Sequence, residues 1–362
     1  MDCPRIPEVS YGEFSKHLHD KGAAQRLPLA VTVELTERCN LRCAHCYINL
    51  AAGDRKAWQR ELKLDQWTRI LDEMAAAGTL WLLLTGGEIL LHPDFREIYR
   101  YAKKLGMVIT LFSNGTLITP ELADFLQDWP PFEVEVTVYG RTRATYEAVT
   151  RVPGSYEQCL RGIDRLLARR LPLQLKTAVL TLNAHELRDL KAWAQDMGAR
   201  FRFDPALNAR LDGGKDPLTF RLPPEEVVEL DRDDPQRYQE LQERWQKYGG
   251  RPVNSDYLYT CGVGRSSCHL DAYGNLFPCM MVRTSRFDLQ RGSLQEAWQE
   301  FLPRIREQKP RGNYPCGQCD LIVLCDNCPA WSQLECGDPE IPVSFLCNIA
   351  QLRAKTLIDR KA

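Results

Sequence analysis

The chain has 362 residues, of which 44% are hydrophobic, and its formal net charge is −1 at pH 7. This size allows one large core, with or without a smaller attached domain, and a charge near zero gives no indication of a nucleic-acid partner. No apolar run reaches the roughly 18 residues of a membrane span, and Met1–Leu29 contains no signal-like stretch. We therefore expect a soluble cytoplasmic protein without nucleic-acid or membrane partners.

Short apolar runs alternate with amphipathic segments between about residues 28 and 208. The predicted strands are Leu29–Thr36, Leu80–Thr85, Val108–Phe112, Glu133–Val138, Leu173–Leu180 and Arg200–Phe203. The predicted helices are Leu64–Ala77, Phe95–Leu105, Pro120–Trp129, Tyr156–Arg170 and His185–Met197. Such alternation predicts a parallel sheet with right-handed crossovers. Six units form either an open doubly wound sheet or part of a (β/α) barrel, and in both the chemistry lies at the C-terminal ends of the strands.

The remainder of the chain has a different composition. Residues 209–224 are rich in glycine and proline, Glu225–Tyr248 has the spacing of a solvated surface helix, and a cysteine-rich segment runs from about 256 to 347. Phe345–Ile358 can form a last helix. The predicted division is an N-terminal extension 1–27, an α/β domain 28–208, a connector 209–255, a cysteine-rich domain 256–348 and a helical tail 349–362.

Cysteine is the unusual residue type, because the chain has 14 and most of them are grouped. In a reducing compartment, grouped cysteines are more often metal ligands than disulfide partners. Cys3 and Cys159 stand alone in the sequence and are expected to be core cysteines that bind no metal. The repeated two- and three-residue spacings of the others indicate metal sites.

Three of these cysteines, Cys39, Cys43 and Cys46, directly follow the first predicted strand. A [4Fe–4S] cluster has four irons, usually each with one thiolate, so three ligands leave one iron open. An open metal position is typical of catalysis, and the amino and carboxylate groups of a methionine moiety could chelate that iron. Zinc held by Cys43, Cys46 and distant partners is the competing interpretation.

The Cys-x3-Cys-x2-Cys pattern, with His45 before the last cysteine and Tyr47 after it, resembles the signature of the radical S-adenosylmethionine (SAM) superfamily. The resemblance implies a partial (β/α)6 TIM-like barrel, a [4Fe–4S] cluster held by the three cysteines as the catalytic centre, and SAM bound beside it, with Tyr47 among the cofactor-binding residues.

Three further loops lie where the resemblance implies SAM contacts. Gly86-Gly87-Glu88 ends the second strand, and in the family this motif holds the methionine ammonium; the family usually has proline next, whereas this chain has Ile89. Polar residues of the third and fourth strand ends, Ser113, Asn114 and Thr137, suit ribose and carboxylate contacts. Each of them could equally be plain turn chemistry.

The cysteine-rich segment resembles the SPASM extension, which occurs on radical enzymes that mature peptides and proteins. The pattern is Cys261-x6-Cys268-x5-Gly274-x4-Cys279, then Cys316-x2-Cys319-x5-Cys325-x2-Cys328, followed by Cys336 and Cys347. Carried over by position, one auxiliary [4Fe–4S] cluster takes Cys261, Cys268, Cys279 and Cys328. The other takes Cys316, Cys319, Cys325 and Cys347. The last pair is one residue shorter than in the family, so Cys336 is the alternative to Cys328. A structural zinc ribbon is the competing interpretation.

The resemblance implies an enzyme that forms a 5′-deoxyadenosyl radical and oxidatively modifies a ribosomally made peptide, by a crosslink or another C–H functionalisation. Oxidation or decarboxylation of a small molecule, such as a tetrapyrrole side chain, is the alternative, and a non-enzymatic metal-binding scaffold is the alternative from another class. The implied partners are a precursor peptide, a flavodoxin- or ferredoxin-type reductant and, because few residues precede the first strand, a separate peptide-recognition protein.

Overall fold

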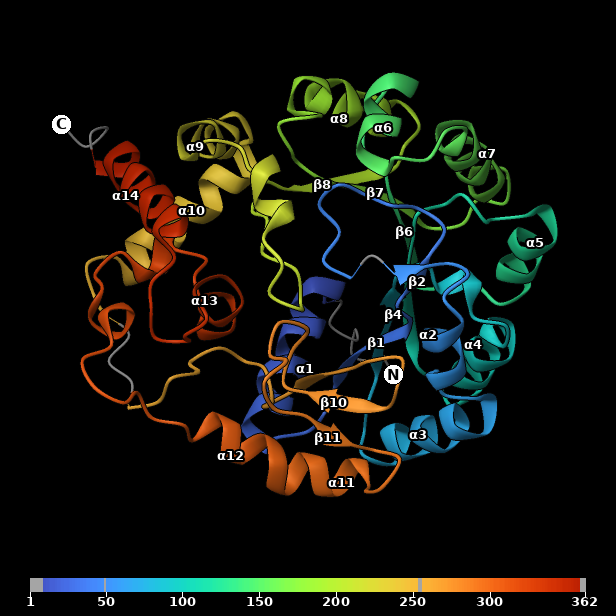
Figure 1. The fold of residues 1–362 in the computed structure, drawn as a ribbon, viewed down its shortest axis with the longest axis horizontal. Helices are drawn as coiled ribbons and strands as arrows, with labels where there is room; N and C mark the ends of the chain where they lie inside the picture. Colours follow the sequence, from blue (N-terminus) through green and yellow to red (C-terminus); the bar gives the residue numbers. More distant parts are fainter. Residues whose placement is uncertain (1–8, 49, 253–255, 359–362) are drawn as a thin grey trace, which may run out of the picture.

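The computed structural model describes residues 9–48, 50–252 and 256–358 (Figure 1). A nine-stranded sheet forms the centre of the fold, in the order β11-β10-β9-β1-β4-β5-β6-β7-β8. Six of its strands are parallel neighbours: β1 (Ala30–Thr36), β4 (Trp81–Gly86), β5 (Val108–Ser113), β6 (Glu133–Thr137), β7 (Leu173–Ala178) and β8 (Arg200–Asp204). They form the curved wall of a partial (β/α)6 barrel, so the barrel, and not the open doubly wound sheet, is the correct form of the predicted fold.

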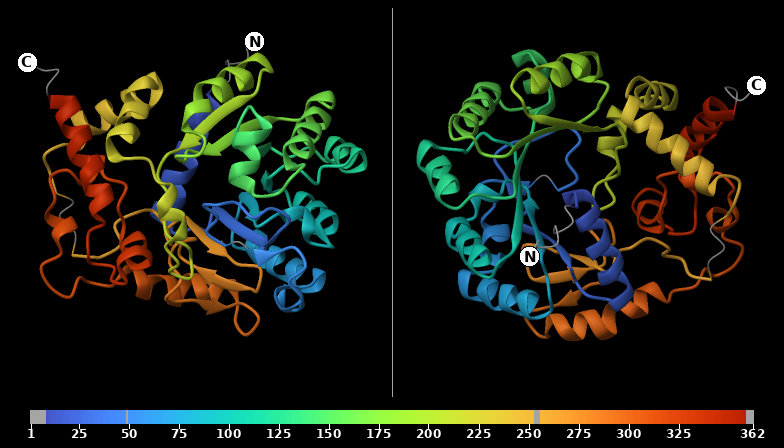
Figure 2. Two further views of the ribbon diagram at one scale, coloured as in Figure 1. Left: turned by 45° about the horizontal axis from the view of Figure 1, so that its top comes forward. Right: turned by 180° about the vertical axis from the view of Figure 1, so that it is seen from behind.

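Helices cover the outside of this wall (Figures 1 and 2). They are α2 (Arg55–Arg60), α3 (Leu64–Ala76), α4 (Phe95–Lys104), α5 (Pro120–Asp128), α6 (Arg143–Thr150), α7 (Ser155–Ala168) and α8 (Leu187–Asp196). All six predicted strands and all five predicted helices are present to within a few residues. The sequence reasoning missed α2 and α6.

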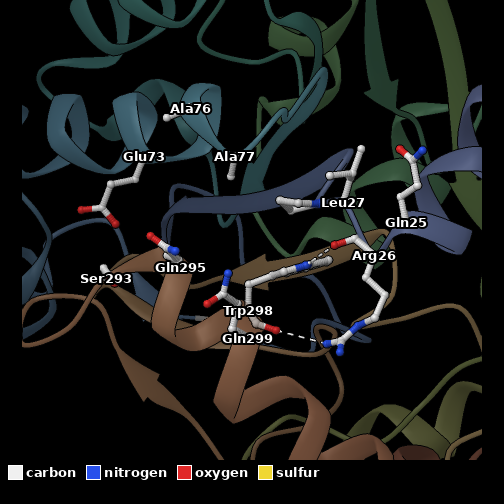
Figure 3. A pocket seen from close by; sticks show the side chains of 11 residues that line it. Gln25, Arg26, Leu27, Glu73, Ala76, Ala77, Ser293, Gln295, Trp298 and Gln299 are labelled. Carbon is white, nitrogen blue, oxygen red and sulfur yellow. Dashed lines mark hydrogen bonds between the residues drawn. The ribbon is translucent and has the colours of Figure 1, made fainter.

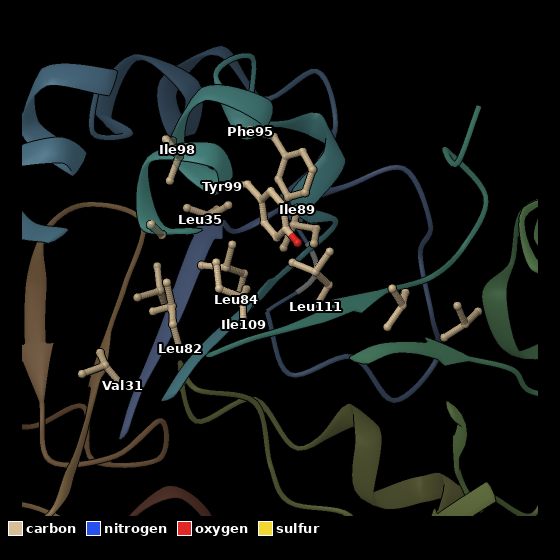
Figure 4. Packing of buried hydrophobic residues seen from close by; sticks show 14 of the residues in the cluster. Val31, Leu35, Leu82, Leu84, Ile89, Phe95, Ile98, Tyr99, Ile109 and Leu111 are labelled. Carbon is tan, nitrogen blue, oxygen red and sulfur yellow. The ribbon is translucent and has the colours of Figure 1, made fainter. Parts of the chain in front are cut away.

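The alternation of side chains along the strands separates an apolar outer face from a polar inner face. Register partners such as Val31 and Leu82 face the same side of the sheet. On the outer face they pack with Ile98 and Tyr99 of α4, and these side chains are almost fully buried (Figure 4). The inner face therefore carries the polar side chains that are left for chemistry.

The N-terminal helix α1 (Tyr11–Gln25) lies at the amino ends of the strands, and it too was missed. The Tyr11 hydroxyl accepts a hydrogen bond from the indole of Trp81, the first residue of β4, at 2.9 Å. The Tyr11 ring contacts Phe132 just before β6, and His19 stacks on Trp81. Because α1 packs at this end, the carboxyl ends of the strands are left for a ligand.

The cysteine-rich segment joins the barrel directly. Its first strand, β9 (Ser267–Leu270), pairs in parallel with β1, and β10 (Asn275–Phe277) and β11 (Phe287–Asp288) continue the sheet in antiparallel fashion. The helices α11 (Leu294–Glu296) and α12 (Leu302–Arg306) follow, joined by a single π-helical turn, Ala297–Phe301. The sheet therefore crosses the predicted boundary between barrel and cysteine-rich domain.

Four helices surround the remaining cysteines: α9 (Pro224–Asp233), α10 (Pro235–Tyr248), α13 (Pro329–Cys336) and α14 (Ser344–Ile358). They share small hydrophobic clusters that are separate from the barrel core. The predicted boundary at residue 348 falls inside α14, and the division into domains remains a prediction. Within the described ranges, no helix is both long enough and apolar enough to cross a membrane.

Candidate active site in the barrel

A cavity of about 610 Å³ opens at the carboxyl ends of the barrel strands. It brings together residues from strand ends that are far apart in the sequence. The predicted site residues among its lining are Cys39, Cys43, Cys46, Tyr47, Gly86, Gly87, Ser113, Asn114, Thr137, Cys268 and Cys279. The size suits a cofactor together with the group on which it acts, since ligand sites span roughly 300–1,000 Å³.

The loop with the first three cysteines is fixed at both ends. At its start, the buried Arg38 guanidinium makes two hydrogen bonds, of 2.8 and 2.9 Å, to the buried carboxylate of Glu61. Farther along, the backbone N–H groups of Arg42 and Ala44 donate to carbonyls of Thr150 and Val149 at the end of α6. The three thiols are therefore held in place by the surrounding scaffold.

Burial and nearby negative charge make Cys39 and Cys43 reluctant to ionise without a cation. Burial, followed by the charge of Glu88, raises the pKa of Cys39 to about 12. The pKa of Cys43 is raised well above its ordinary value by burial and then by the neighbouring thiolates of Cys46 and Cys39. Positive iron would relieve both penalties. The donor set therefore fits an iron–sulfur cluster with three protein ligands.

His45, between these cysteines, supports the same fit. Its Nδ1 atom is buried and finds no hydrogen-bond partner among the described residues, although the side chain lines the cavity. Burial lowers the pKa of His45 to about 4, so the ring is neutral. An orphaned buried nitrogen beside three thiols is consistent with a group bound there.

Gly86 and Gly87 are required by close packing of the backbone. A Cβ atom on Gly86 would lie 2.2 Å from the carbonyl oxygen of Thr36, and one on Gly87 would lie 2.2 Å from that of Arg38. The backbone N–H of Gly87 also donates to Thr36 at 2.7 Å. The glycines thus let the end of β4 join the start of the cysteine loop, which brings both to one wall of the cavity.

Glu88 lies behind the cavity wall. Its fully buried carboxylate accepts hydrogen bonds from the Ser113 hydroxyl at 3.0 Å and from the Asn114 backbone N–H at 2.8 Å. Burial raises the pKa of Glu88 to about 7, although these donors favour its charged form. The geometry gives Glu88 the role of positioning the loop after β5. Direct binding of the methionine ammonium by this residue stays a prediction.

Asn114 reaches the cysteine loop itself. Its side-chain amide donates to the Cys39 sulfur at 3.7 Å and to the Asn40 side chain at 2.9 Å, while its oxygen accepts from Thr116. Tyr47 and Thr137 line the same cavity. The structure therefore gathers these residues around the three thiols, and their contacts with SAM stay predictions.

Three charged side chains on the inner barrel face were missed by the sequence reasoning. Glu135, Lys176 and Arg202 stand side by side on β6, β7 and β8, and Arg202 binds Glu135 at 2.6 Å. Burial lowers the pKa of Lys176 well below its ordinary value. Lys176 and Arg202 both line the cavity. Charged residues inside otherwise apolar predicted strands were the signal that could have revealed them.

A second missed network joins the barrel to the cysteine-rich segment. Glu34 is fully buried on β1 and contacts His269 of β9 at 3.4 Å and Arg283 at 3.2 Å. Burial opposes ionisation of Glu34, but the interactions with His269 and Arg283 outweigh it and lower the pKa of that carboxyl. The network fixes β9 at the rim of the cavity.

The C-terminal cysteines form two groups. In the first, Cys261 and Cys279 are near enough to Cys328 for their charges, together with burial, to raise its pKa to about 11. In the second, burial and then the charges of neighbouring thiolates raise the pKa values of Cys316, Cys325 and Cys347, and Cys319 is one of those neighbours. Within the described segments, no three histidine, cysteine or carboxylate side chains are close enough to share a single metal ion.

Two cysteines lie apart from these groups. Cys336 ends α13, is exposed, and has Glu335, Lys215 and Asp338 as its charged neighbours. Cys268 is buried in β9, and burial alone raises its pKa to about 12. The arrangement favours Cys328 over Cys336 as a ligand, and among the described residues no thiol contributes to the raised pKa of Cys268.

A further cavity, of about 620 Å³, lies on the other side of the molecule between α1, α3 and the π-helical turn (Figure 3). There the Trp298 indole donates to the Arg26 carbonyl at 2.5 Å, and the Arg26 guanidinium donates to the Trp298 carbonyl at 3.2 Å. Its lining lacks cysteine and lies near the amino ends of the strands. It is not part of the candidate active site.

Comparison with known proteins agrees with this geometry. The model of the Radical SAM superfamily matches residues 33–194. An AdoMet-dependent heme synthase of Methanosarcina barkeri is 26% identical and covers 87% of this chain and 95% of its own length. The sporulation killing factor maturation protein SkfB of Bacillus subtilis is 25% identical over 91% of this chain and 76% of its own.

The fold is also shared with solved structures. SuiB of Streptococcus suis, in a crystal structure with S-adenosylmethionine, aligns with a TM-score of 0.69 at 14% identity and covers 94% of this chain and 84% of its own. Another structure of SuiB holds the precursor peptide SuiA. The matched segment begins within β1, contains the cysteine loop and continues through β7 into α8. Residues 33–194 therefore form a radical SAM domain, and the chain is an enzyme with SAM and [4Fe–4S] clusters as its cofactors.

Proposed function

We propose that this enzyme oxidatively modifies a ribosomally made peptide, by forming a crosslink or by another C–H functionalisation. The observation that carries the proposal is the pair of C-terminal thiol groups, because two auxiliary cluster sites of this kind resemble the SPASM extension of peptide maturases. A maturation protein among the relatives and a fold shared with a peptide-bound enzyme support it.

The barrel residues have defined tasks in this reaction. Cys39, Cys43 and Cys46 would hold the catalytic cluster, which with SAM supplies a 5′-deoxyadenosyl radical able to remove a hydrogen atom from an unactivated C–H bond. Asn114 orients the loop around Cys39 through its amide. The curved barrel wall would shield the radical from water and side reactions.

The C-terminal residues complete the oxidation. After hydrogen-atom removal, the substrate must lose one electron and one proton before a new bond or a double bond is complete. Cys261, Cys279 and Cys328 on one side, and the group that contains Cys316 on the other, would hold the acceptors for that electron. Cys279 lines the barrel cavity, so the first of these sites borders the place where the substrate radical arises.

Oxidation of a tetrapyrrole side chain is the second candidate, and two observations favour it. The Methanosarcina barkeri relative is a heme synthase of comparable length. In addition, the basic side chains of Lys176 and Arg202 line the cavity, and a carboxylate of such a molecule would favour the charged form of Lys176 that burial disfavours.

The proposal also includes the protein partners of the enzyme and its cellular compartment. A flavodoxin- or ferredoxin-type protein would supply the electron for SAM cleavage, and a separate small protein would present the precursor peptide. The cytoplasm suits a chain with so many thiols, because a reducing compartment keeps them available as ligands.

The test is anaerobic turnover of the reconstituted enzyme with SAM and dithionite. We expect 5′-deoxyadenosine, formed faster when a peptide encoded beside the gene is added, together with a mass loss of that peptide. Stimulation by a carboxylated tetrapyrrole with no response to peptides would overturn the first candidate in favour of the second. A Lys176→Met variant sharpens the choice, since only the second candidate requires that cation for substrate binding.

A further inference from the structure

The orientation of Cys268 follows from the register of β9. In the parallel pairing of β9 with β1, Cys268 is the partner of Val31, and His269 is the partner of Thr32. Partners on neighbouring strands face the same side of a sheet, and consecutive residues face opposite sides. Val31 belongs to the outer, helix-covered core (Figure 4), so Cys268 faces that core as well.

The surroundings of Cys268 agree with that orientation. Its side chain is buried among the apolar residues of the barrel core, together with Leu270 two positions farther along the strand. His269, between them, points the other way and contacts Glu34. Ser267, Cys268 and His269 all line the cavity, and because consecutive side chains alternate, part of that lining is backbone.

The three cysteines predicted to share a cluster with Cys268 lie elsewhere. Cys279 and Cys328 pack against one separate hydrophobic cluster, which includes Leu258 and Tyr259. Cys261 lies beside the same cluster, because the Arg306 guanidinium donates to the Cys261 carbonyl at 2.6 Å and to the Tyr259 carbonyl at 3.3 Å. Cys268 belongs instead to the barrel-core cluster.

Among the described residues, no other cysteine can take the fourth place. Cys336 is exposed at the far end of α13, whereas Cys328 caps the start of that helix. Cys159 lies in the barrel core beside Tyr146. The remaining thiols form the second C-terminal group or the barrel loop.

We infer that the first auxiliary cluster is held by only three thiolates, from Cys261, Cys279 and Cys328, and that its fourth iron takes a nitrogen or oxygen donor from a substrate or from solvent. Cys279, Pro278 and Met280 line the barrel cavity, so this cluster site borders the cavity that receives the substrate. The inference holds whether the substrate is a peptide or a tetrapyrrole, and it makes Cys268 a packing residue of β9.

The test must distinguish the open iron of the first auxiliary cluster from the open iron of the catalytic cluster. The catalytic cluster is therefore removed by mutation. A full-length chain with Cys39, Cys43 and Cys46 all replaced by alanine should still bind about eight irons after anaerobic reconstitution, from two four-iron clusters. Adding Cys268→Val to this background should leave the iron content and the electron paramagnetic resonance spectrum of the reduced clusters unchanged. Adding Cys328→Ala, the matched change, should lower the iron content towards about four.

A second measurement does not depend on the folding of a Cys268 variant. In the same triple-alanine background with Cys268 intact, the reduced protein is mixed with ¹⁵N-labelled imidazole and examined by electron–nuclear double resonance. A ¹⁵N coupling on a cluster signal is expected if one auxiliary iron is open. The absence of any coupling, or a loss of about four irons in a folded Cys268→Val protein, would overturn the inference.

Discussion

The barrel loop and the cysteine-rich segment hold their thiols in opposite ways. Cys39, Cys43 and Cys46 lie within eight residues, in a loop that the barrel fixes through the Arg38–Glu61 pair and backbone hydrogen bonds. The C-terminal thiols are spread over residues 261–347, between short helices and small hydrophobic clusters. The difference indicates that the barrel scaffold positions the catalytic loop by itself, and we expect the C-terminal segment to depend on bound clusters for part of its own stability.

The largest expected effect comes from the barrel loop. Cys43→Ala should abolish 5′-deoxyadenosine formation, because the catalytic site loses one of its three local ligands. The C-terminal thiols lie in other elements, so about eight of about twelve irons should remain. Liquid chromatography and iron analysis measure the two quantities, and full 5′-deoxyadenosine yield from this variant would refute the assignment of Cys43.

A ligand change in the cysteine-rich segment should loosen that segment selectively. Cys316→Ala should increase hydrogen–deuterium exchange in α13 and α14, because loss of the cluster removes folding free energy there. The barrel strands should keep their protection, and Cys336→Ala is the matched control that should change nothing. Equal loss of protection in both regions would contradict the comparison.

The Arg38–Glu61 pair should matter for the stability of the barrel loop. Arg38→Met leaves a buried carboxylate without its partner, which typically costs about 3–5 kcal/mol. A lower thermal midpoint and weaker retention of the catalytic cluster should result. Lys16→Met, at an exposed ion pair of α1, should change neither quantity.

Glu88→Gln should have a smaller effect, on SAM affinity. The variant loses a charge-assisted hydrogen bond to the loop of Ser113 and Asn114, worth roughly 1.5–3 kcal/mol. If the lost hydrogen bond weakens SAM binding by the same free energy, the dissociation constant for SAM rises by about ten- to hundred-fold. Equilibrium binding measures it, and an unchanged constant would leave Glu88 with a role in the turn alone.

Regular periodicity made most of the barrel predictable. The strands around Val31, Leu82 and Ile109 are short apolar runs between amphipathic helices, and such alternation is compatible with only a few fold architectures. The local spacing of Cys39, Cys43 and Cys46 gave the catalytic loop in the same way. These features depend on neighbours in sequence, which is the information that a single sequence contains.

Contacts between distant segments could not be predicted. β9 pairs with β1, from which it is far removed in the sequence, and this register places Cys268 beside Val31. The family resemblance implied that Cys268 is a cluster ligand, and that assignment stays a prediction against which the inference from the register stands. Helix α1 was missed because its exposed, polar composition resembles a loose extension. The role of Glu88 was likewise hidden, since only the fold brings Asn114 to its carboxylate.

The metal content of the reconstituted full-length enzyme tests the central claim most directly. Three cluster sites predict about twelve irons and a matching amount of sulfide per chain, with Cys43→Ala retaining about eight. Iron, acid-labile sulfide and zinc are measured together by elemental and colorimetric analysis. About four irons per chain, accompanied by tightly bound zinc, would contradict the account, because the C-terminal thiols would then hold zinc and could not accept electrons.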